Sequence, residues 1–319
     1  MRKKRNRTME TNMSLSIEEL IADLANSDKP LSRVRLTELS NLSSEGVVFL
    51  SQVWMSIELK RRQQIIYRLV ELAEDNFEIN FDSILENCLK DQDDEVRSKA
   101  IEGLWENEES SLINPLINLL KYDISNKVRV AAATALGKFT ILAEHKKLRP
   151  CHRSKLEEAL LSVIGDKSKP IDVRRRALEA VSPLSLPRVK KVVMEAYQSH
   201  NAQLRASAVY AMGKSCNRSW LLILLKELAN ADAEIRYEAA GACGELGEEE
   251  AIPYLIELIS DPDTNVQLAA IQAIGKIGGS EARECLEECR SNPSEVIQEA
   301  AEQALEETKT VGALFSFKA

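Results

Sequence analysis

The sequence predicts an all-α protein, a right-handed α-solenoid of about nine helix–turn–helix repeats. Three observations predict this fold class. One pattern of small and apolar residues returns along most of the chain. Each clear copy follows a short apolar segment of helical period. Aromatic residues (5%) and glycines (12 of 319 residues) are too scarce for a β-sandwich or a doubly wound sheet.

The repeated pattern reads apolar-Arg-x-x-Ala-x-x-x-apolar-Gly, and we call its first apolar residue the anchor. Five copies follow one another at a spacing of 31 residues, which chance does not produce. Two clear copies stand before them at looser spacing, and two degenerate copies precede those. In chain order the anchors are Val34, Arg61, Val96, Val128, Val173, Leu204, Ile235, Val266 and Ile297.

These anchors divide the chain into segments. We expect one solenoid over residues 17–308, because a single repeat cannot bury its apolar face alone and stacking supplies the core. The expected segments are a disordered basic tail (1–16), degenerate repeats (17–79), regular repeats (80–308) with an insertion (141–155), and a C-terminal tail (309–319).

Each repeat is expected to hold two helices. The first is the apolar segment, in which Pro115 and Pro253 stand where a first helical turn tolerates proline. The second begins after an Asp-containing turn and ends at glycine, as a helix terminus prefers. Gly213 and the glycine-rich tails 241–247 and 275–278 are therefore interpreted as helix ends, not as parts of phosphate-binding or dinucleotide-binding loops. Alanines four and seven places after the anchor share one side of the second helix and admit close helix approach.

The copy Asp232-x-x-Ile235-Arg236-x-x-Ala239-x-x-x-x-Gly244, together with an Ala-Ile-Pro-x-Leu-Ile helix, resembles the HEAT repeat. More narrowly, it resembles the short bacterial HEAT-like variety first named from phycobilisome lyases. The resemblance covers residues 80–308 well and 17–79 weakly. It implies the fold, but it leaves the function open, because scaffolds, adaptors and a few enzymes share this repeat.

An arginine follows the anchor in five of the seven clear copies. We interpret these arginines as a structural ladder whose members pair with turn aspartates, such as Asp93, Asp172, Asp232 and Asp263; an anion-binding ladder is the alternative. Glutamines replace the arginine at 267 and 298, which predicts that the ladder fades there. The ladder consists of Arg97, Arg129, Arg174, Arg205 and Arg236.

Two surfaces are candidates for binding. The second helices line the inner, concave surface of such solenoids, and positions two and six after the anchor share one exposed stripe there. Tyrosine and arginine in this stripe are typical of interface hot spots, although the tyrosines could instead cover the seam between repeats. The stripe residues are Arg175, Glu179, Tyr210, Tyr237, Leu268 and Gln272. The second candidate is a basic loop in the insertion, with Lys146, Lys147, Arg149, Arg153 and Lys155; a solvated connector is its alternative.

The leading function hypothesis is a non-catalytic protein-interaction scaffold or adaptor. The alternative that the resemblance implies is a phycobilin lyase-like chromophore chaperone or lyase subunit, and a HEAT-like DNA-binding protein is the third reading. A di-iron enzyme of the deoxyhypusine hydroxylase type is disfavoured, because none of His145, His152 and His200 is followed by glutamate. We expect no catalytic residues, no metal and no cofactor.

Charge and hydropathy narrow the choice of partner. The net charge is −8, and acidic residues outnumber basic ones by 15 between Glu227 and Lys309. This imbalance argues against nucleic acid and favours a basic segment as the partner of the C-terminal third. No apolar run approaches the length of a membrane span and no signal peptide is recognisable, so we expect a cytoplasmic protein.

Overall fold

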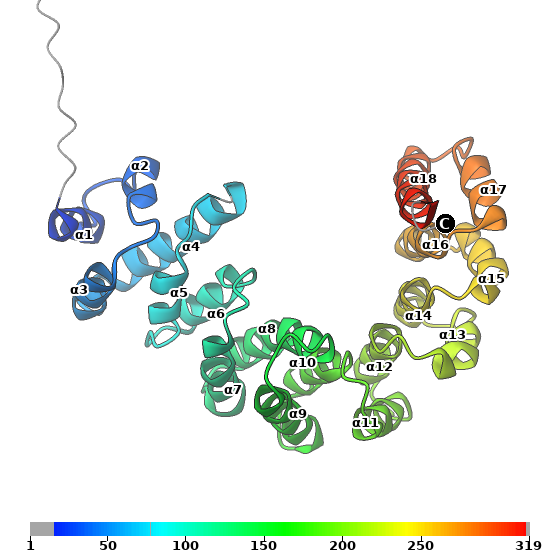
Figure 1. Ribbon diagram of the computed structural model, residues 1–319, viewed down its shortest axis with the longest axis horizontal. Coiled ribbons are helices and arrows are strands. Elements are labelled where there is room, and N and C mark those ends of the chain that lie inside the picture. The colour runs from blue at the N-terminus through cyan, green and yellow to red at the C-terminus, as the bar shows by residue number, and fades with distance from the viewer. Residues whose placement is uncertain (1–15, 77, 317–319) are drawn as a thin grey trace, which may run out of the picture. The chain divides into compact units, whose positions relative to one another are not determined.

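The computed structural model describes residues 16–76 and 78–316, with side chains as far as Glu306. In these ranges the chain forms α-helices, short 3-10 helices and turns, and no strand. The predicted all-α solenoid is confirmed. The described residues divide into two compact units, one ending at Asn107 and the other beginning at Glu108; Figure 1 labels their helices. The predicted continuity of one solenoid over 17–308 stays a prediction. No helix in the described ranges is both long and apolar enough to cross a bilayer.

Unit 1 holds the degenerate repeats and the first clear one. Its buried polar centre is Asp91, whose carboxylate accepts a hydrogen bond from Trp54 Nε1 at 2.5 Å and lies 3.4 Å from Arg62 Nη1. Arg61 stands where other repeats have an apolar anchor, and its Nε donates to the Leu24 carbonyl at 2.7 Å. A buried arginine that bonds to backbone thus replaces the apolar anchor. The helices are α1 (Ile17–Ala25), α2 (Arg33–Thr37), α3 (Ser44–Trp54), α4 (Leu59–Asp75), α5 (Asp82–Cys88) and α6 (Asp94–Gly103).

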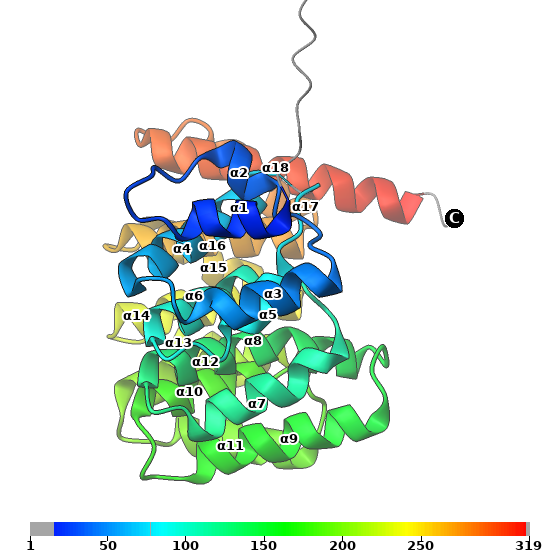
Figure 2. The ribbon, with the colours of Figure 1, turned by 90° about the vertical axis from the view of Figure 1, so that its left-hand side faces the viewer.

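Unit 2 consists of two rows of helices. The second helices of its repeats, α8 to α18 with even numbers, pack each against the next, and the first helices, α7 to α17 with odd numbers, pack behind them. Figure 2 shows the pairs following one another from green to red. The first helices are α7 (Ile113–Tyr122), α9 (Pro150–Gly165), α11 (Pro187–Tyr197), α13 (Leu221–Glu227), α15 (Ile252–Glu257) and α17 (Ser280–Cys289). The second helices are α8 (Asn126–Glu144), α10 (Ile171–Val181), α12 (Ala202–Lys214), α14 (Ala233–Leu246), α16 (Thr264–Ile277) and α18 (Glu295–Ser316).

Glycines inside the second helices let neighbouring helices approach closely. A Cβ built on Gly213 would lie 2.5 Å from Ala242 Cα, and one built on Gly244 would lie 2.8 Å from Ala273 Cα. The interpretation of Gly213, Gly244 and Gly275 as helix ends is therefore wrong, because these residues lie within helices, under the backbone or alanine of the next repeat. The interpretation is confirmed at Gly247 and Gly278, the last glycines of the two tails, where α14 and α16 end with φ angles of 69° and 72°.

The insertion is mostly helical rather than a loop. Helix α8 continues to Glu144 and α9 begins at Pro150, so that only residues 145–149 connect them. Leu142 and Ala143 are buried and continue the apolar side of α8, which explains why the helix does not end earlier. The extra residues of this repeat therefore lengthen its helices.

Candidate functional site

The arginine ladder makes one contact that repeats along the row of second helices. Its guanidinium group donates to the backbone carbonyl six residues earlier, in the turn that precedes the second helix, for example from Arg236 Nη1 to the Asn230 oxygen at 2.8 Å. Arg174 differs, because its Nε donates to the Ile164 carbonyl at 3.0 Å. The same six-residue bond is made by Arg97 (2.7 Å), Arg129 (2.6 Å), Arg205 (3.2 Å), Gln267 (2.8 Å) and Gln298 (2.6 Å).

The expectation that the ladder fades at Gln267 and Gln298 is therefore wrong, because a glutamine amide makes the same bond. The ladder fastens each second helix to the turn before it. Satisfying a buried turn carbonyl in this way stabilises the turn by about 1 kcal/mol. This contact uses the polar hydrogens of the side chain but needs no charge, which explains why an amide can stand in for a guanidinium.

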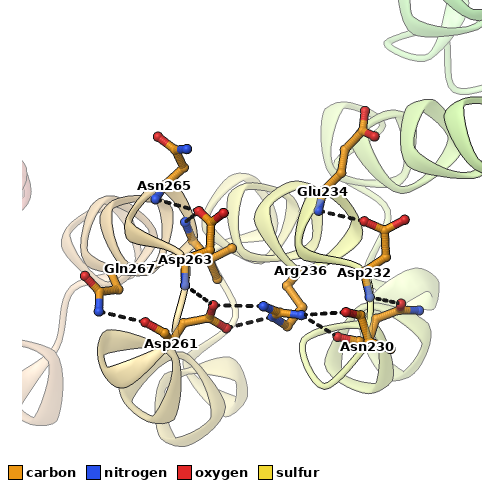
Figure 3. Close-up of polar contacts among 10 residues, drawn as sticks. Asn230, Asp232, Glu234, Arg236, Asp261, Asp263, Asn265 and Gln267 are labelled. Carbon is orange, nitrogen blue, oxygen red and sulfur yellow. Dashed lines mark hydrogen bonds and ion pairs between the residues drawn. The ribbon is translucent and has the colours of Figure 1, made fainter.

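Arg236 also joins two repeats, as Figure 3 shows. Its Nε and Nη2 donate to the two carboxylate oxygens of Asp261, at 2.7 and 2.9 Å. The partner is not the predicted turn residue Asp263, whose carboxylate instead accepts the N–H of Asn265 at 2.8 Å and caps α16. Asp261 also accepts the Asp263 N–H at 2.9 Å, so that one buried carboxylate fixes both the turn and the neighbouring repeat. The pKa of Asp261 lies below its ordinary value, mainly because of the hydrogen bonding from the Arg236 guanidinium.

Two substitutions at Arg236 separate its contacts. Arg236→Gln is expected to keep the bond to the Asn230 carbonyl but leave the Asp261 charge unpaired, lowering the free energy of unfolding by about 1–3 kcal/mol. Arg236→Ala loses both contacts and is expected to cost about 1 kcal/mol more. Adding Asp261→Asn to Arg236→Gln should restore most of the lost stability, because it removes the unpaired charge while the amide oxygen still accepts the Asp263 N–H. Urea unfolding measures all three variants, and a further loss in the double variant contradicts this account.

Three of the six residues of the predicted stripe line a pocket on the second helices. Tyr210, Tyr237 and Gln272 line this pocket of about 170 Å³, formed by α12, α14 and α16. Leu268 does not line it. The tyrosines therefore face one space, with 45% of Tyr237 exposed and Tyr210 half-buried. The remaining lining residues are Lys214, Glu238, Gly241, Ala242, Glu245, Ala269, Ala273 and Lys276.

Arg175 and Glu179, the other two stripe residues, form a polar network with α12. Arg175 Nε donates to Ser207 Oγ at 3.1 Å, and the Ser207 hydroxyl donates to Glu179 Oε1 at 2.6 Å. The second oxygen of Glu179 pairs with Arg176 Nη1 at 2.6 Å. The structure thus engages both stripe residues within the protein.

Glu238 is the lining residue that sequence reasoning missed. Its half-buried carboxylate has no hydrogen bond or ion pair to any described residue. Burial, then the charges of Glu179 and Glu234, raise the pKa of Glu238 to about 7, against the opposing effect of Arg175 and Arg176. One signal was present in the sequence, because the third residue after the anchor is acidic in this copy alone among the clear ones.

The two lysines of the pocket share one carboxylate. Glu245 Oε1 accepts from Lys276 Nζ at 2.8 Å and lies 3.1 Å from Lys214 Nζ. Burial acts to raise the pKa of Glu245, but the two lysines outweigh it and hold that pKa below its ordinary value. Lys214 Nζ also lies 5.7 Å from the centre of the Tyr210 ring. Glu245 is thus satisfied, in contrast to Glu238.

The basic residues of the insertion gather elsewhere. Lys146 and Lys147 lie in the short connection, and Arg149 is the last residue before α9, where its side chain makes no capping hydrogen bond. Arg153 pairs with Glu144 at 2.9 Å, and Lys155 Nζ donates to Asn114 Oδ1 at 3.2 Å. None of the five lines the tyrosine pocket, so the two predicted surfaces are separate features.

The described residues contain no group of three or more His, Cys, Asp or Glu side chains placed to hold a metal ion. Cys243, Cys285 and Cys289 are buried, and burial raises the thiol pKa of Cys243 and of Cys285 to about 12. Thiols with such pKa values are poor nucleophiles at neutral pH. They belong to the packed core.

Comparison with known proteins agrees with the fold. A family model described as HEAT repeats matches residues 82–151 and 221–306. No curated protein sequence matches the chain. The chain is similar in structure to Kap95 in a complex with Nup1 (15% identity, TM-score 0.51, 92% of this chain and 46% of that one) and to Kap95p in a structure with RanGDP (15%, 0.50, 92% and 45%).

The complex of CpcE and CpcF of the phycocyanin lyase from Nostoc is 15% identical, with a TM-score of 0.49, and the alignment covers 96% of this chain and 100% of that one. At such identities the likeness to solved structures shows the fold alone. Repeats of one spacing, paired helices in two rows and the matching family model lead to one conclusion: the chain is a HEAT-like repeat protein.

Proposed function

We propose that this HEAT-like protein is a non-catalytic interaction scaffold whose partner protein binds across the second helices of unit 2. The observation that carries the proposal is the tyrosine pocket. Tyr237 is 45% exposed beside a half-buried carboxylate without a partner. Aromatic side chains that border a small pocket are typical of interface hot spots. The perturbed pKa of Glu238 is typical of functional sites.

The size of the pocket favours a protein partner over a large ligand. Its volume of about 170 Å³ lies below the roughly 300–1,000 Å³ of pockets that enclose drug-sized ligands. Such a space suits one side chain of a partner. A phycobilin lyase-like activity would require a site for a tetrapyrrole, and the tyrosine pocket is too small to enclose one. Incubating the purified protein with a bilin tests this alternative. Bilin binding should change the absorbance spectrum of the bilin, and an unchanged spectrum contradicts the alternative.

Removing the two tyrosines is expected to abolish partner binding while leaving the fold intact. In the native host, tagged Tyr210→Ala/Tyr237→Ala protein should recover a specific partner at least about tenfold less well than the unchanged protein, the usual effect of losing a hot spot. Quantitative mass spectrometry of the co-purified proteins measures the loss. Circular dichroism and thermal melting should remain nearly unchanged.

Tyr254→Ala is the matched control, because Tyr254 is 48% exposed but lies on the first helix α15. It should recover the partner normally. A second variant, Gly241→Leu, fills the pocket while keeping both tyrosines, since nothing lies within 4 Å of a Cβ built on Gly241. Equal recovery by the wild-type and Gly241→Leu proteins contradicts the proposal. Unfolding of the tyrosine variant would instead assign these residues to the seam between repeats.

A further inference from the structure

We propose that the tyrosine pocket binds a single lysine or arginine side chain from an extended segment of the partner protein. The cationic group pairs with Glu238, and the aliphatic stem lies against the rings of Tyr210 and Tyr237. This inference rests on the proposed function and names the chemistry that the site recognises.

The Glu238 carboxylate of the pocket has no bonded partner in the described part of the chain. Glu179 is engaged by Ser207 and Arg176, and Glu245 by two lysines. Glu238 has no such partner among the described residues, although it is half-buried and lines the same pocket. A carboxylate that is partly removed from water without a cation or a donor is unfavourable. A bound ammonium or guanidinium group supplies the missing charge and hydrogen bonds.

Neighbouring carboxylates contribute to two raised pKa values at the pocket. The pKa of Tyr210 is raised, first by burial and then by Glu179, Glu238 and Glu245, which outweigh Arg176. The pKa of Glu238 is raised in the same way. Burial is the largest cause of both shifts, and the charges of nearby glutamates add to it, so an added negative charge is disfavoured here. The charged groups near Glu238 are Arg175, Arg176 and Glu179 from α10, Lys214 from α12, Glu234 and Glu245 from α14, and Lys276 from α16.

The shape of the site fits a long aliphatic side chain with a cationic end. Tyrosine rings attract cations through their faces. Gly241, Ala242, Ala269 and Ala273 add only small side chains to the lining, so a methylene stem can lie along it. Lysine and arginine combine such a stem with a cationic end. The C-terminal third as a whole also favours a cationic partner, since acidic residues outnumber basic ones by 15 between residues 227 and 309.

A titration with small probes tests the proposal without knowledge of the partner. The full chain, with its tyrosine rings labelled with ¹³C, is titrated with the N-acetyl N-methylamides of lysine, arginine and norleucine, and of glutamate. The two cationic probes are expected to shift the ring resonances of Tyr210 and Tyr237, assigned with the Tyr210→Phe and Tyr237→Phe variants. Norleucine, which has the stem without the charge, should bind roughly tenfold more weakly or not at all.

Glu238→Gln keeps the shape of the side chain and removes its charge. This substitution should lower the affinity for the cationic probes about tenfold at pH 8, where Glu238 is ionised. For the wild-type protein, apparent affinity should rise about tenfold between pH 6 and pH 8, because the cation binds the carboxylate and protons compete with it. In Glu238→Gln this dependence should disappear, while the lysine probe stays charged throughout.

Two results overturn the inference. If norleucine shifts the rings as strongly as lysine does, the pocket recognises only apolar groups. If the glutamate probe binds and lysine does not, Lys214 and Lys276 make it an anion site. Either result leaves the proposed scaffold function standing as long as Gly241→Leu loses the partner. Conversely, if the lysine probe binds specifically but Gly241→Leu recovers the partner normally, the pocket recognises a cation and the proposal that the partner binds at this surface is wrong.

Discussion

Gly213→Ala is expected to lower the free energy of unfolding by about 3 kcal/mol, at the upper end of the usual cost of overpacking. The new methyl carbon would lie 2.5 Å from Ala242 Cα and 2.7 Å from Ala242 Cβ. The nearest atom belongs to the backbone of α14, so it cannot move aside by changing rotamer. Helices α12 and α14 must separate, which disturbs the packing of two repeats.

Gly241→Ala is the matched control and should raise the free energy of unfolding. Gly241 is exposed within α14, and a Cβ built there has nothing within 4 Å. Replacing a glycine inside a helix with alanine stabilises it by about 0.5–1 kcal/mol. Urea unfolding followed by circular dichroism measures both variants under the same conditions. If Gly213→Ala is neutral or stabilising, the close approach of α12 and α14 does not require glycine.

These two glycines show what the sequence could and could not predict. The spacing of 31 residues predicted the helix pairs and the stacked repeats, because periodic apolar and small residues determine which faces must be buried. The role of each glycine could not be read in this way. A glycine near the end of a helical pattern can adopt a positive φ, as Gly247 does, or admit a neighbouring helix, as Gly213 does. Only the position of the next repeat distinguishes the two.

The same limit explains the outcome at the candidate site. The periodicity placed Tyr210 and Tyr237 on one stripe, and the structure brings them to one pocket. Sequence reasoning missed Glu238 because what distinguishes this residue is the lack of a partner. That lack depends on the bonds that Arg175, Arg176 and Glu179 of α10 make among themselves and with α12. The Arg236 pairing shows a similar dependence. Asp261 and Asp263 are two residues apart in one turn, and only the folded turn shows which one faces the arginine.

Glu238→Gln is expected to stabilise the protein at alkaline pH and to have little effect at acidic pH. The pKa of Glu238 is about 7 in the folded protein, above its ordinary value of 4.5, mainly because of burial. The folded state therefore binds more protons than the unfolded state between these two pH values. By linkage, the contribution of Glu238 to stability falls as pH rises from about 4.5 to about 7 and is constant above that.

The size of this effect has an upper bound. The difference between the two pKa values corresponds to at most about 3 kcal/mol, and partial solvent exposure reduces the expectation to about 1–2 kcal/mol. Urea unfolding of wild-type and Glu238→Gln protein at pH 4.5 and pH 8 measures it, with Glu299→Gln on the exposed surface of α18 as a control of the same chemical change. An equal effect of Glu238→Gln at both pH values contradicts the raised pKa.

This destabilisation connects the site to its ligand. A charge that costs stability in the free protein is relieved when a cation binds, so the ligand must stabilise the wild-type protein more than Glu238→Gln at pH 8. With the acetylated lysine probe at one hundred times its dissociation constant, mass action raises the stability of the wild-type protein by about 2.7 kcal/mol. Glu238→Gln, at the same probe concentration, should gain roughly 1 kcal/mol less, because its affinity is about tenfold lower. If the probe stabilises both proteins equally, the cation does not bind at Glu238.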